Sequence, residues 1–351
     1  MIEYKNPFCI RNTHLNCPLP LTLEAYWNCE ADCLHCMGRN LNRIWGEEQR
    51  IADPEKVRQK FISASKNNGK SPLSVALKLK KAIWVGRKSD PYQPIEMELE
   101  ITRSYIHTFI HFKQQFIICS RYIPNADRDE SLFIKAKNLL TFLVEITPGM
   151  ESDWEIFERR RTPCVSDRLE IASKWMRKGV AVGVRGEPFI PGYHTLAQFR
   201  NTIRRVKSFG FKSYNTYNLH VNAYTMRRLH DAGMDIEKIW HYNQDEFWRP
   251  IQRDLCRIAD EEGIILGCPD FVNTPKGWRS RTNTCCGVDV PGAFTFNTHQ
   301  WKICLQNGLM SQEEILASSW EGIGAEQDKE MARLIMLGKS NDFYTMGDVE
   351  L

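Results

Sequence analysis

The chain has 351 residues, of which 42% are hydrophobic, 26% charged and 11% aromatic, and its formal net charge is only +4. This composition is that of a globular protein and excludes intrinsic disorder, collagen and coiled coil as the main structure. Apolar stretches such as 139–146 are far shorter than the roughly 20 residues of a membrane-spanning helix. Because the N-terminus also lacks the cationic and apolar regions of a secretory signal, we expect a soluble, cytoplasmic protein with no membrane partner.

Short apolar segments rich in Val, Ile, Phe, Tyr and Thr recur along the first two thirds of the chain and predict strands. In chain order, the predicted strands are 19–27, 82–85, 116–120, 140–147, 180–185 and 213–219. Helical patterns lie between them. Asp53 and Pro54 supply an N-cap and a first helical proline for a helix that runs to about residue 66, and Gly179 is a typical C-cap for a helix over 167–178.

Repeated strand-then-helix units imply a parallel sheet with helices packed against it. About six such units fit between residues 19 and 235. The predicted fold class is therefore α/β, a partial (β/α)6 TIM-type barrel whose functional site lies at the carboxyl ends of the strands. A doubly wound open sheet is the alternative.

The character of the sequence changes after residue 263. Gly, Pro, Asn, Thr and Cys crowd residues 267–297, and regular periodicity disappears until two short helical patterns at 311–318 and 326–337. We therefore expect three parts, which are an N-terminal extension (1–18), the barrel (19–262) and an irregular C-terminal accessory region or lid (263–351).

Three of the 12 cysteines lie in one short loop directly after the first predicted strand. Cys29, Cys33 and Cys36 form a Cys-x3-Cys-x2-Cys pattern. In a reducing compartment, spaced cysteines bind metal or do chemistry more often than they form disulfides, and thiolates suit iron–sulfur clusters or zinc. Three thiolates leave one iron of a four-iron cluster open, whereas structural zinc takes four ligands. Zinc would need a distant cysteine or His35, which adjoins Cys36 and makes binding by both awkward.

This cysteine pattern resembles the signature of the radical S-adenosylmethionine (SAM) superfamily. The resemblance implies that Cys29, Cys33 and Cys36 hold a [4Fe–4S] cluster whose open iron binds the methionine part of SAM, and that His35 lies near the adenine. It also implies reductive cleavage of SAM to a 5′-deoxyadenosyl radical that abstracts hydrogen from a substrate. A reducing partner such as flavodoxin or ferredoxin and a partial (β/α)6 barrel belong to the same resemblance.

Within the superfamily, the chain resembles spore photoproduct lyase and its relatives through segments at four predicted strand ends. These segments are 86–92, 118–121, 144–147 and 184–192. The resemblance implies that Ser89 and Asp90 lie by the amino group of SAM and that Arg121 faces its carboxylate, which suits the charges of these groups. An ion pair of Arg121 with Glu145 at the barrel end is the alternative. The further SAM-binding candidates are Gly86, Glu145, Arg185 and Glu187.

One departure from the resemblance concerns the reaction. Photoproduct lyases carry, shortly before the Ser-Asp pair, a cysteine that returns a hydrogen atom to the product radical, and Arg87 stands at the corresponding position here. We therefore do not expect thymine-dimer repair by that route. Cys119, at the end of the third predicted strand, is either the alternative hydrogen donor or a core residue. The candidate catalytic residues are Cys119, Arg87 and Tyr92.

Four further cysteines lie in the predicted C-terminal region, namely Cys268, Cys285, Cys286 and Cys304. Adjacent cysteines rarely bind one metal ion, and the remaining spacings match no defined cluster pattern. A second cluster and separate roles, such as one redox-active or hydrogen-donating thiol, both stay open.

Cationic side chains gather in four parts of the sequence, with aromatic residues interleaved. These parts are 159–161, 200–207, 227–228 and 279–281. Such mixtures suit phosphate contacts and base stacking, although a net charge of +4 is low for a nucleic-acid-binding protein. With the resemblance, they predict a lyase or isomerase that modifies, rearranges or repairs a modified pyrimidine in DNA, as in bacteriophage DNA hypermodification. The alternatives are a radical SAM enzyme acting on a peptide or small metabolite, and a non-catalytic nucleic-acid-binding protein with a structural metal site.

Overall fold

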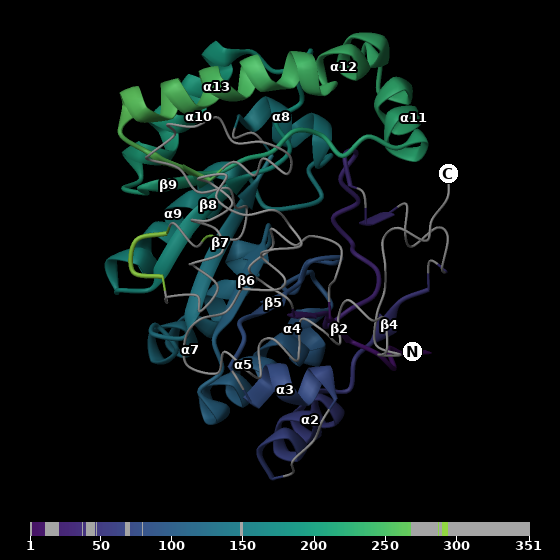
Figure 1. The fold of residues 1–351 in the computed structure, drawn as a ribbon, viewed down its shortest axis with the longest axis vertical. Helices are drawn as coiled ribbons and strands as arrows, with labels where there is room; N and C mark the ends of the chain where they lie inside the picture. The colour runs from purple at the N-terminus through teal and green to yellow at the C-terminus, as the bar shows by residue number, and fades with distance from the viewer. Residues whose placement is uncertain are drawn as a thin grey trace, which may run out of the picture.

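The computed structural model describes residues 2–10, 21–36, 38–39, 46, 48–66, 71–78, 80–147, 150–267, 287 and 290–293. Within these residues, eight strands form one sheet in the order β10-β9-β8-β7-β6-β5-β3-β2. Seven of these described strands run parallel, and β2 pairs antiparallel with β3. The sheet is not closed in the described part of the chain, which is therefore a partial TIM-type barrel (Figure 1).

The strands of this sheet are short. They are β2 (Phe8–Ile10), β3 (Leu21–Leu23), β5 (Ile83–Val85), β6 (Phe116–Ser120), β7 (Leu140–Ile146), β8 (Ala181–Gly186), β9 (Ser213–Asn215) and β10 (Ile265–Gly267). A separate pair, β1 (Ile2–Glu3) and β4 (Arg50–Ile51), is also parallel.

The central strands are apolar runs because both of their faces are covered. All five residues of β6 and six of the seven in β7 are buried. The register places Ser120 of β6 opposite Val144 of β7, and Glu145 opposite Arg185 of β8. These polar side chains therefore gather at the carboxyl ends of neighbouring strands.

Helices pack around the sheet (Figure 1). α2 packs on α3 and α5, α9 packs on β7 and β8, and α13 packs on α10 and β10. Their bounds, with those of the other helices, are α2 (Pro54–Lys66), α3 (Pro72–Lys78), α4 (Glu96–Leu99), α5 (Ile101–Phe112), α6 (Ile123–Ala126), η1 (Asp127–Asp129), α7 (Glu130–Lys135), α8 (Glu151–Phe157), α9 (Val165–Arg177), α10 (Leu196–Ser208), α11 (Ala223–Asp231), α12 (Ile236–Tyr242) and α13 (Asp245–Glu262). None of the helices in the described ranges is both long and apolar enough to span a membrane.

The starts of the later helices follow from local sequence. The Thr195 hydroxyl and the Gln198 side chain form a capping box at α10. Asn222 Oδ1 accepts the Thr225 N–H at 2.9 Å and thereby caps α11. These caps fix the starts of the two helices.

The predicted fold class is confirmed, and the described sheet has one parallel strand more than the six predicted. All six predicted strands are present, although the first and last are shorter than predicted. The additional parallel strand, β10, lies beyond residue 262, where its short apolar run directly precedes the Gly- and Pro-containing segment predicted to be irregular. β2 lies in the segment predicted as an N-terminal extension, and it adds an antiparallel edge to the sheet.

A part of the predicted accessory region packs into the barrel. Val290 belongs to an apolar cluster with Trp84, Cys119 and Leu143. At Gly287, where φ is +71°, an added Cβ would lie 2.6 Å from Leu143 Cδ2, so only glycine fits. The helices predicted at 311–318 and 326–337 lie outside the described residues, as do Cys268, Cys285, Cys286 and Cys304.

Candidate functional site

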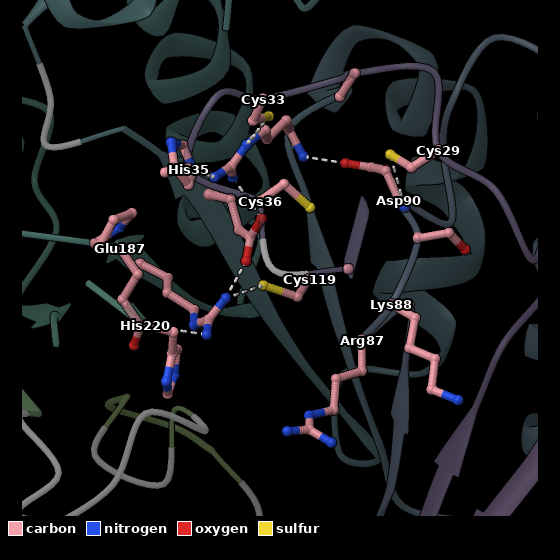
Figure 2. Close-up of a pocket in the computed structure, with 18 of the residues that line it drawn as sticks. Cys29, Cys33, His35, Cys36, Arg87, Lys88, Asp90, Cys119, Glu187 and His220 are labelled. Carbon is pink, nitrogen blue, oxygen red and sulfur yellow. Dashed lines mark hydrogen bonds and ion pairs between the residues drawn. The ribbon is translucent and has the colours of Figure 1, made fainter. Parts of the chain in front are cut away.

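A cavity of ≈ 200 Å³ lies at the carboxyl ends of the parallel strands (Figure 2). The loops after β3 and β5 and the last residues of β6, β7 and β8 form its wall. Of the site residues predicted from the sequence, all but Tyr92 line it. They are Cys29, Cys33, His35, Cys36, Gly86, Arg87, Ser89, Asp90, Cys119, Arg121, Glu145, Arg185 and Glu187.

Tyr92 lies in the core beside the site. Its side chain is fully buried, and its hydroxyl donates a hydrogen bond to Asp129 Oδ2 at 3.1 Å. The Tyr92 ring also contacts Phe133 and Phe142. The structure thus gives Tyr92 a packing role and does not bring it to the cavity.

The three thiols of the loop after β3 share one cavity wall. Cys29 Sγ accepts the Asp90 N–H at 3.4 Å, and Cys33 Sγ accepts the Arg121 Nε–H at 3.4 Å. The Cys36 N–H donates to the Cys33 carbonyl at 3.1 Å, which turns the loop so that both side chains face the cavity. Donors aimed at sulfur stabilise thiolate ligands of a cluster.

Burial raises the pKa of the Cys29 thiol to about 12 and that of Cys33 well above its usual value. A buried thiolate therefore needs a compensating cation, which bound iron would supply. As placed, no group of three or more Cys, His, Asp or Glu side chains within the described residues is gathered closely enough to hold a single metal ion.

Other features of the cavity fit a bound polar group. His35 Nδ1 and Glu187 Oε1 are buried, and neither has a hydrogen-bond partner among the described residues. At Gly38, an added Cβ would lie 2.9 Å from the Lys88 carbonyl oxygen and 3.4 Å from Cys36 Sγ, so the loop approaches too closely for any other residue. The donor set therefore fits a cluster held by three thiolates and a ligand with its own polar atoms.

Arg121 fixes the state of His35. One Arg121 amino group, Nη2, lies 3.1 Å from His35 Nε2. Because a guanidinium only donates, Nε2 accepts this bond and Nδ1 carries the imidazole proton. Burial, assisted by the Arg121 charge, lowers the pKa of His35 to about 3. His35 is therefore a neutral donor facing the cavity.

Glu145 joins two arginines across the strand ends. Arg121 Nη1 donates to Glu145 Oε2 at 2.5 Å, and Arg185 donates to the other carboxylate oxygen as well as to Glu187. Burial would raise the pKa of Glu145, but the two guanidinium groups outweigh it and lower the pKa to about 2. The ion pair of Arg121 with Glu145, an alternative left open by the sequence, is present in the structure.

The loop after β5 is held in place by hydrogen bonds to other parts of the protein. Asp90 accepts hydrogen bonds from Ser120 Oγ at 2.7 Å and from the Arg121 N–H at 2.6 Å, and Ser89 Oγ donates to the Tyr26 carbonyl at 2.6 Å. Burial raises the pKa of Asp90 to about 6 against these bonds. Ser89 and Asp90 thus lie at the cavity wall with their positions fixed by protein contacts.

Glu24 and Gly86 shape the same loop. The Glu24 carboxylate accepts the backbone N–H groups of Arg87 at 3.2 Å and Lys88 at 3.1 Å. Gly86 has φ of +77°, and an added Cβ would lie 2.3 Å from Pro91 Cδ. Gly86 is therefore required by the backbone conformation. The turn that it makes accounts for its position at the cavity wall.

Cys119 lies at the end of β6, where it both lines the cavity and packs on Trp84 and Leu143. Its sulfur is 3.9 Å from Arg185 Nη1 (Figure 2), and burial raises the pKa of the thiol. Cys119 therefore lies at the border of the core and the cavity. This position is compatible with both interpretations from the sequence, a hydrogen donor and a core residue.

Several cavity residues were not predicted from the sequence. One of them is Trp84, whose ring centre lies 5.4 Å from the guanidinium carbon of Arg185. Another is Lys88, whose Nζ lies 5.2 Å from the centre of the Trp27 ring. His220 also lines the cavity and is labelled in Figure 2. Trp84 and His220 fall at or just after predicted strand ends, a signal that could have identified them.

Most of the predicted cationic groups within the described residues pair internally. Arg200 and Arg204 of α10 contact Glu262 of α13 at 2.9 and 3.0 Å, and Arg205 contacts Glu151 at 2.5 Å. Residues 279–281 lie outside the described residues. The α10 arginines thus join helices, which weakens their interpretation as phosphate contacts.

No family model matches the chain, and no curated protein matches it. Solved structures show that its fold is that of the radical SAM enzymes. The similarity is to spore photoproduct lyase, of which one variant has a TM-score of 0.53 and 12% identity over 76% of this chain and 80% of that chain. A variant with a bound dinucleoside spore photoproduct has a TM-score of 0.51 and 12% identity over the same shares. Streptococcus suis SuiB bound to S-adenosylmethionine is less similar, with a TM-score of 0.45 and 13% identity over 72% of this chain and 51% of that chain.

Proposed function

We propose that the chain is a radical SAM enzyme that binds a [4Fe–4S] cluster and SAM. One observation carries the proposal, which is that Cys29, Cys33 and Cys36 line one cavity at the strand ends of a radical SAM fold. Three thiolates from one loop are the ligand set of a cluster with an open iron. The same proposal includes a reducing partner, such as flavodoxin or ferredoxin, and a cytoplasmic location.

When bound, the cluster and SAM supply a 5′-deoxyadenosyl radical that takes a hydrogen atom from the substrate. The protein residues hold the groups in place. We assign the cluster to the three cysteines, with the Asp90 N–H and the Arg121 Nε–H stabilising two of the sulfurs. The remaining SAM contacts in this proposal are His35, Gly86, Ser89, Asp90, Arg121, Glu145, Arg185 and Glu187.

Within the SAM site, two polar atoms are the best supported contacts. His35 Nδ1–H and Glu187 Oε1 are buried at the cavity without partners among the described residues, so they are available as a donor and an acceptor. Arg121 already donates to Glu145, His35 and Cys33. Its proposed contact with the SAM carboxylate is therefore made from a guanidinium whose orientation is fixed before SAM binds.

For the substrate, we propose a modified pyrimidine base in DNA, converted in a lyase or isomerase reaction. The similar spore photoproduct lyase structure holds a dinucleoside photoproduct, and Arg87 and Lys88 bring two cations to the cavity. Apart from the three loop thiols, Cys119 is the cysteine that lines the cavity in the described part of the chain. It is therefore the proposed hydrogen donor, with Arg87 at the place of the lyase cysteine.

The pairing of the α10 arginines with α13 favours a second candidate. If those side chains serve helix packing, the enzyme has less cationic surface for a DNA backbone, and a peptide or small metabolite becomes the substrate.

The test is 5′-deoxyadenosine formation by the anaerobically reconstituted, reduced protein. Buffer, ordinary duplex DNA, DNA with modified pyrimidines, and a panel of peptides and metabolites are compared. Stimulation by modified DNA supports the pyrimidine substrate, and stimulation by a peptide or metabolite alone contradicts it. One zinc per chain and no visible cluster absorbance would replace the whole proposal with a structural metal site in a nucleic-acid-binding protein.

A matched pair of variants isolates the cluster. Cys33→Ala should abolish both the cluster and 5′-deoxyadenosine formation. Cys164→Ser should change neither, because Cys164 is the N-cap residue of α9 and does not line the cavity. Retention of an intact cluster by Cys33→Ala would contradict the ligand assignment.

A further inference from the structure

Asp32 lies in the cysteine loop but points away from the cavity. Ala31 and Cys33 line the cavity, whereas Asp32 does not. Its φ is +46°, in the left-handed region that residues other than glycine, asparagine and aspartate avoid. Such a conformation persists only where surrounding contacts impose it.

Arginines from separate parts of the chain converge on the Asp32 carboxylate. Arg39 Nε and Arg228 Nη2 each lie 2.9 Å from Oδ1, and Arg161 Nη1 lies 3.1 Å from Oδ2. Arg159 follows at 3.6 Å. Arg39 comes just after the loop, Arg159 and Arg161 from the connection between α8 and α9, and Arg228 from α11.

Arg228 also holds the backbone of the loop. Its Nη1 donates to the Cys33 carbonyl oxygen at 2.9 Å, and its Nη2 donates to the Asp32 carbonyl oxygen at 3.1 Å. The Arg228 side chain is only 11% exposed, and its guanidinium carbon lies 5.6 Å from the centre of the Tyr224 ring. One guanidinium on α11 thus fixes two successive peptide groups beside the Cys33 thiol.

We propose that Asp32 and Arg228 are positioning residues that hold the backbone of the cysteine loop at the cavity wall before any metal binds. A loop ordered during folding loses less conformational freedom on binding, so its ligand affinity rises. Several arginines surround the single Asp32 carboxylate. The group therefore carries a net positive charge, which lies behind the cysteines. This inference rests on the proposed function, because it takes the three thiols to be cluster ligands.

The test measures iron per chain, the rate of iron loss to a chelator, and the cluster reduction potential in the full-length reconstituted protein. Arg228→Gln should lose iron about 10-fold faster than the unmodified protein, as expected when a group that orients a ligand is removed. Arg228→Lys should restore part of the retention, because it keeps the charge but lacks the planar fork whose two nitrogens reach the two carbonyl groups separately. Asp32→Gly keeps the backbone conformation and should also lose iron faster.

The cluster reduction potential distinguishes a positioning role from a general loss of structure. Arg228→Gln removes a positive charge and should lower the potential, whereas Asp32→Asn removes a negative charge and should raise it. Asparagine tolerates the left-handed conformation of Asp32. The matched control is Arg160→Asn, because Arg160 is 67% exposed and pairs with Glu155 instead of Asp32. The control should leave both the iron loss and the potential unchanged.

Unchanged iron retention and potential in Arg228→Gln would overturn the proposal, and so would shifts of equal size in Arg160→Asn. If Arg228→Gln does not fold, Asp32→Asn and Arg228→Lys give the same decision. An unmodified protein that retains an iron–sulfur cluster but forms no 5′-deoxyadenosine with any substrate would end the proposed function while leaving this inference standing. An unmodified protein that binds no cluster would end both.

Discussion

Two ion-pair networks in this protein use the same residue types in opposite environments. Behind the cavity, Arg168 and Glu158 are both 0% exposed, and Glu158 also lies 3.6 Å from Arg121 Nε. Between α10 and α13, Arg200 and its partner Glu261 are 28% and 42% exposed, so water screens their charges, and Glu262, at 13%, is the least exposed member of this network. The buried network fixes groups at the site, whereas the exposed one joins two helices at little cost if broken.

The comparison shows why clusters of arginine in a sequence are poor evidence of a binding surface. Residues 159–161 and 200–207 look alike in composition. In the structure, the first group reaches the cysteine loop through Asp32, and the second reaches α13. The partner of each arginine, and not the density of charge, decides what the group does.

The largest effect is expected from Glu158→Gln. This change leaves the Arg168 guanidinium buried without a charged partner, and it weakens the bonds from Thr147 and Thr162. Removing one partner of a buried pair costs about 3–5 kcal/mol of the free energy of unfolding. Urea denaturation checks it, with Glu261→Gln as the exposed control, because the Glu261 side chain is 42% exposed. Equal losses of unfolding free energy in the two variants would show that the buried and exposed networks do not differ in this way.

The same residue predicts an acid dependence. Burial would raise the pKa of Glu158, but Arg168 and Arg121 outweigh it and lower the pKa to about 2, below its usual value of 4.5. A lowered folded-state pKa contributes stability that is complete above pH 4.5 and is lost as the pH falls through 2. The stability difference between the unmodified protein and Glu158→Gln should therefore shrink as acid is added. A difference that stays constant between pH 7 and pH 2.5 would contradict this origin.

A smaller effect is expected at the loop after β5, which connects the buried network to the cavity. Gly86→Ala forces a left-handed alanine against Pro91, and should cost about 1–3 kcal/mol of unfolding free energy. Gly233→Ala is the matched control, because Gly233 has φ of +80° but no neighbouring atom within 4 Å of an added Cβ. The control should lose less, about 1 kcal/mol. Equal losses would show that the Pro91 contact carries no cost.

The smallest effect is expected from Arg200→Gln in the exposed network. Since Arg200 is 28% exposed and its partner Glu261 is 42% exposed, the urea midpoint should change little. Affinity for duplex DNA, measured across a range of salt concentrations, should stay unchanged. A loss of affinity with a flatter salt dependence would instead assign Arg200 to a phosphate contact.

Much of the fold was predictable because parallel strands buried on both faces are recognisable from short segments. The predicted strand 116–120 coincides with β6, and Pro54 marks the start of α2 as predicted. β10 was missed because its short apolar run adjoins the irregular segment that begins at residue 267, and its place in the sheet comes from packing against β9 and α13.

The cavity wall was also predictable, since motifs at the ends of parallel strands must converge. Tyr92 was the exception among the site residues, because a position two residues after Asp90 returns to the core. The Asp32 contacts could not be predicted from the sequence. Arg161 and Arg228 are separated from Asp32 by 129 and 196 residues, and no local pattern marks such a pair.

The packing of Val290 against Trp84 and Cys119 has a consequence for biosynthesis. The wall that these two side chains share with the cavity is supported by a segment that follows α13 in the chain. During translation, the ribosome releases all of the cysteine loop and the strands long before this segment. Until synthesis has passed residue 293, the cavity wall at Trp84 and Cys119 therefore lacks the support of Val290, and the complete packing of this wall is a late event in the life of the new chain.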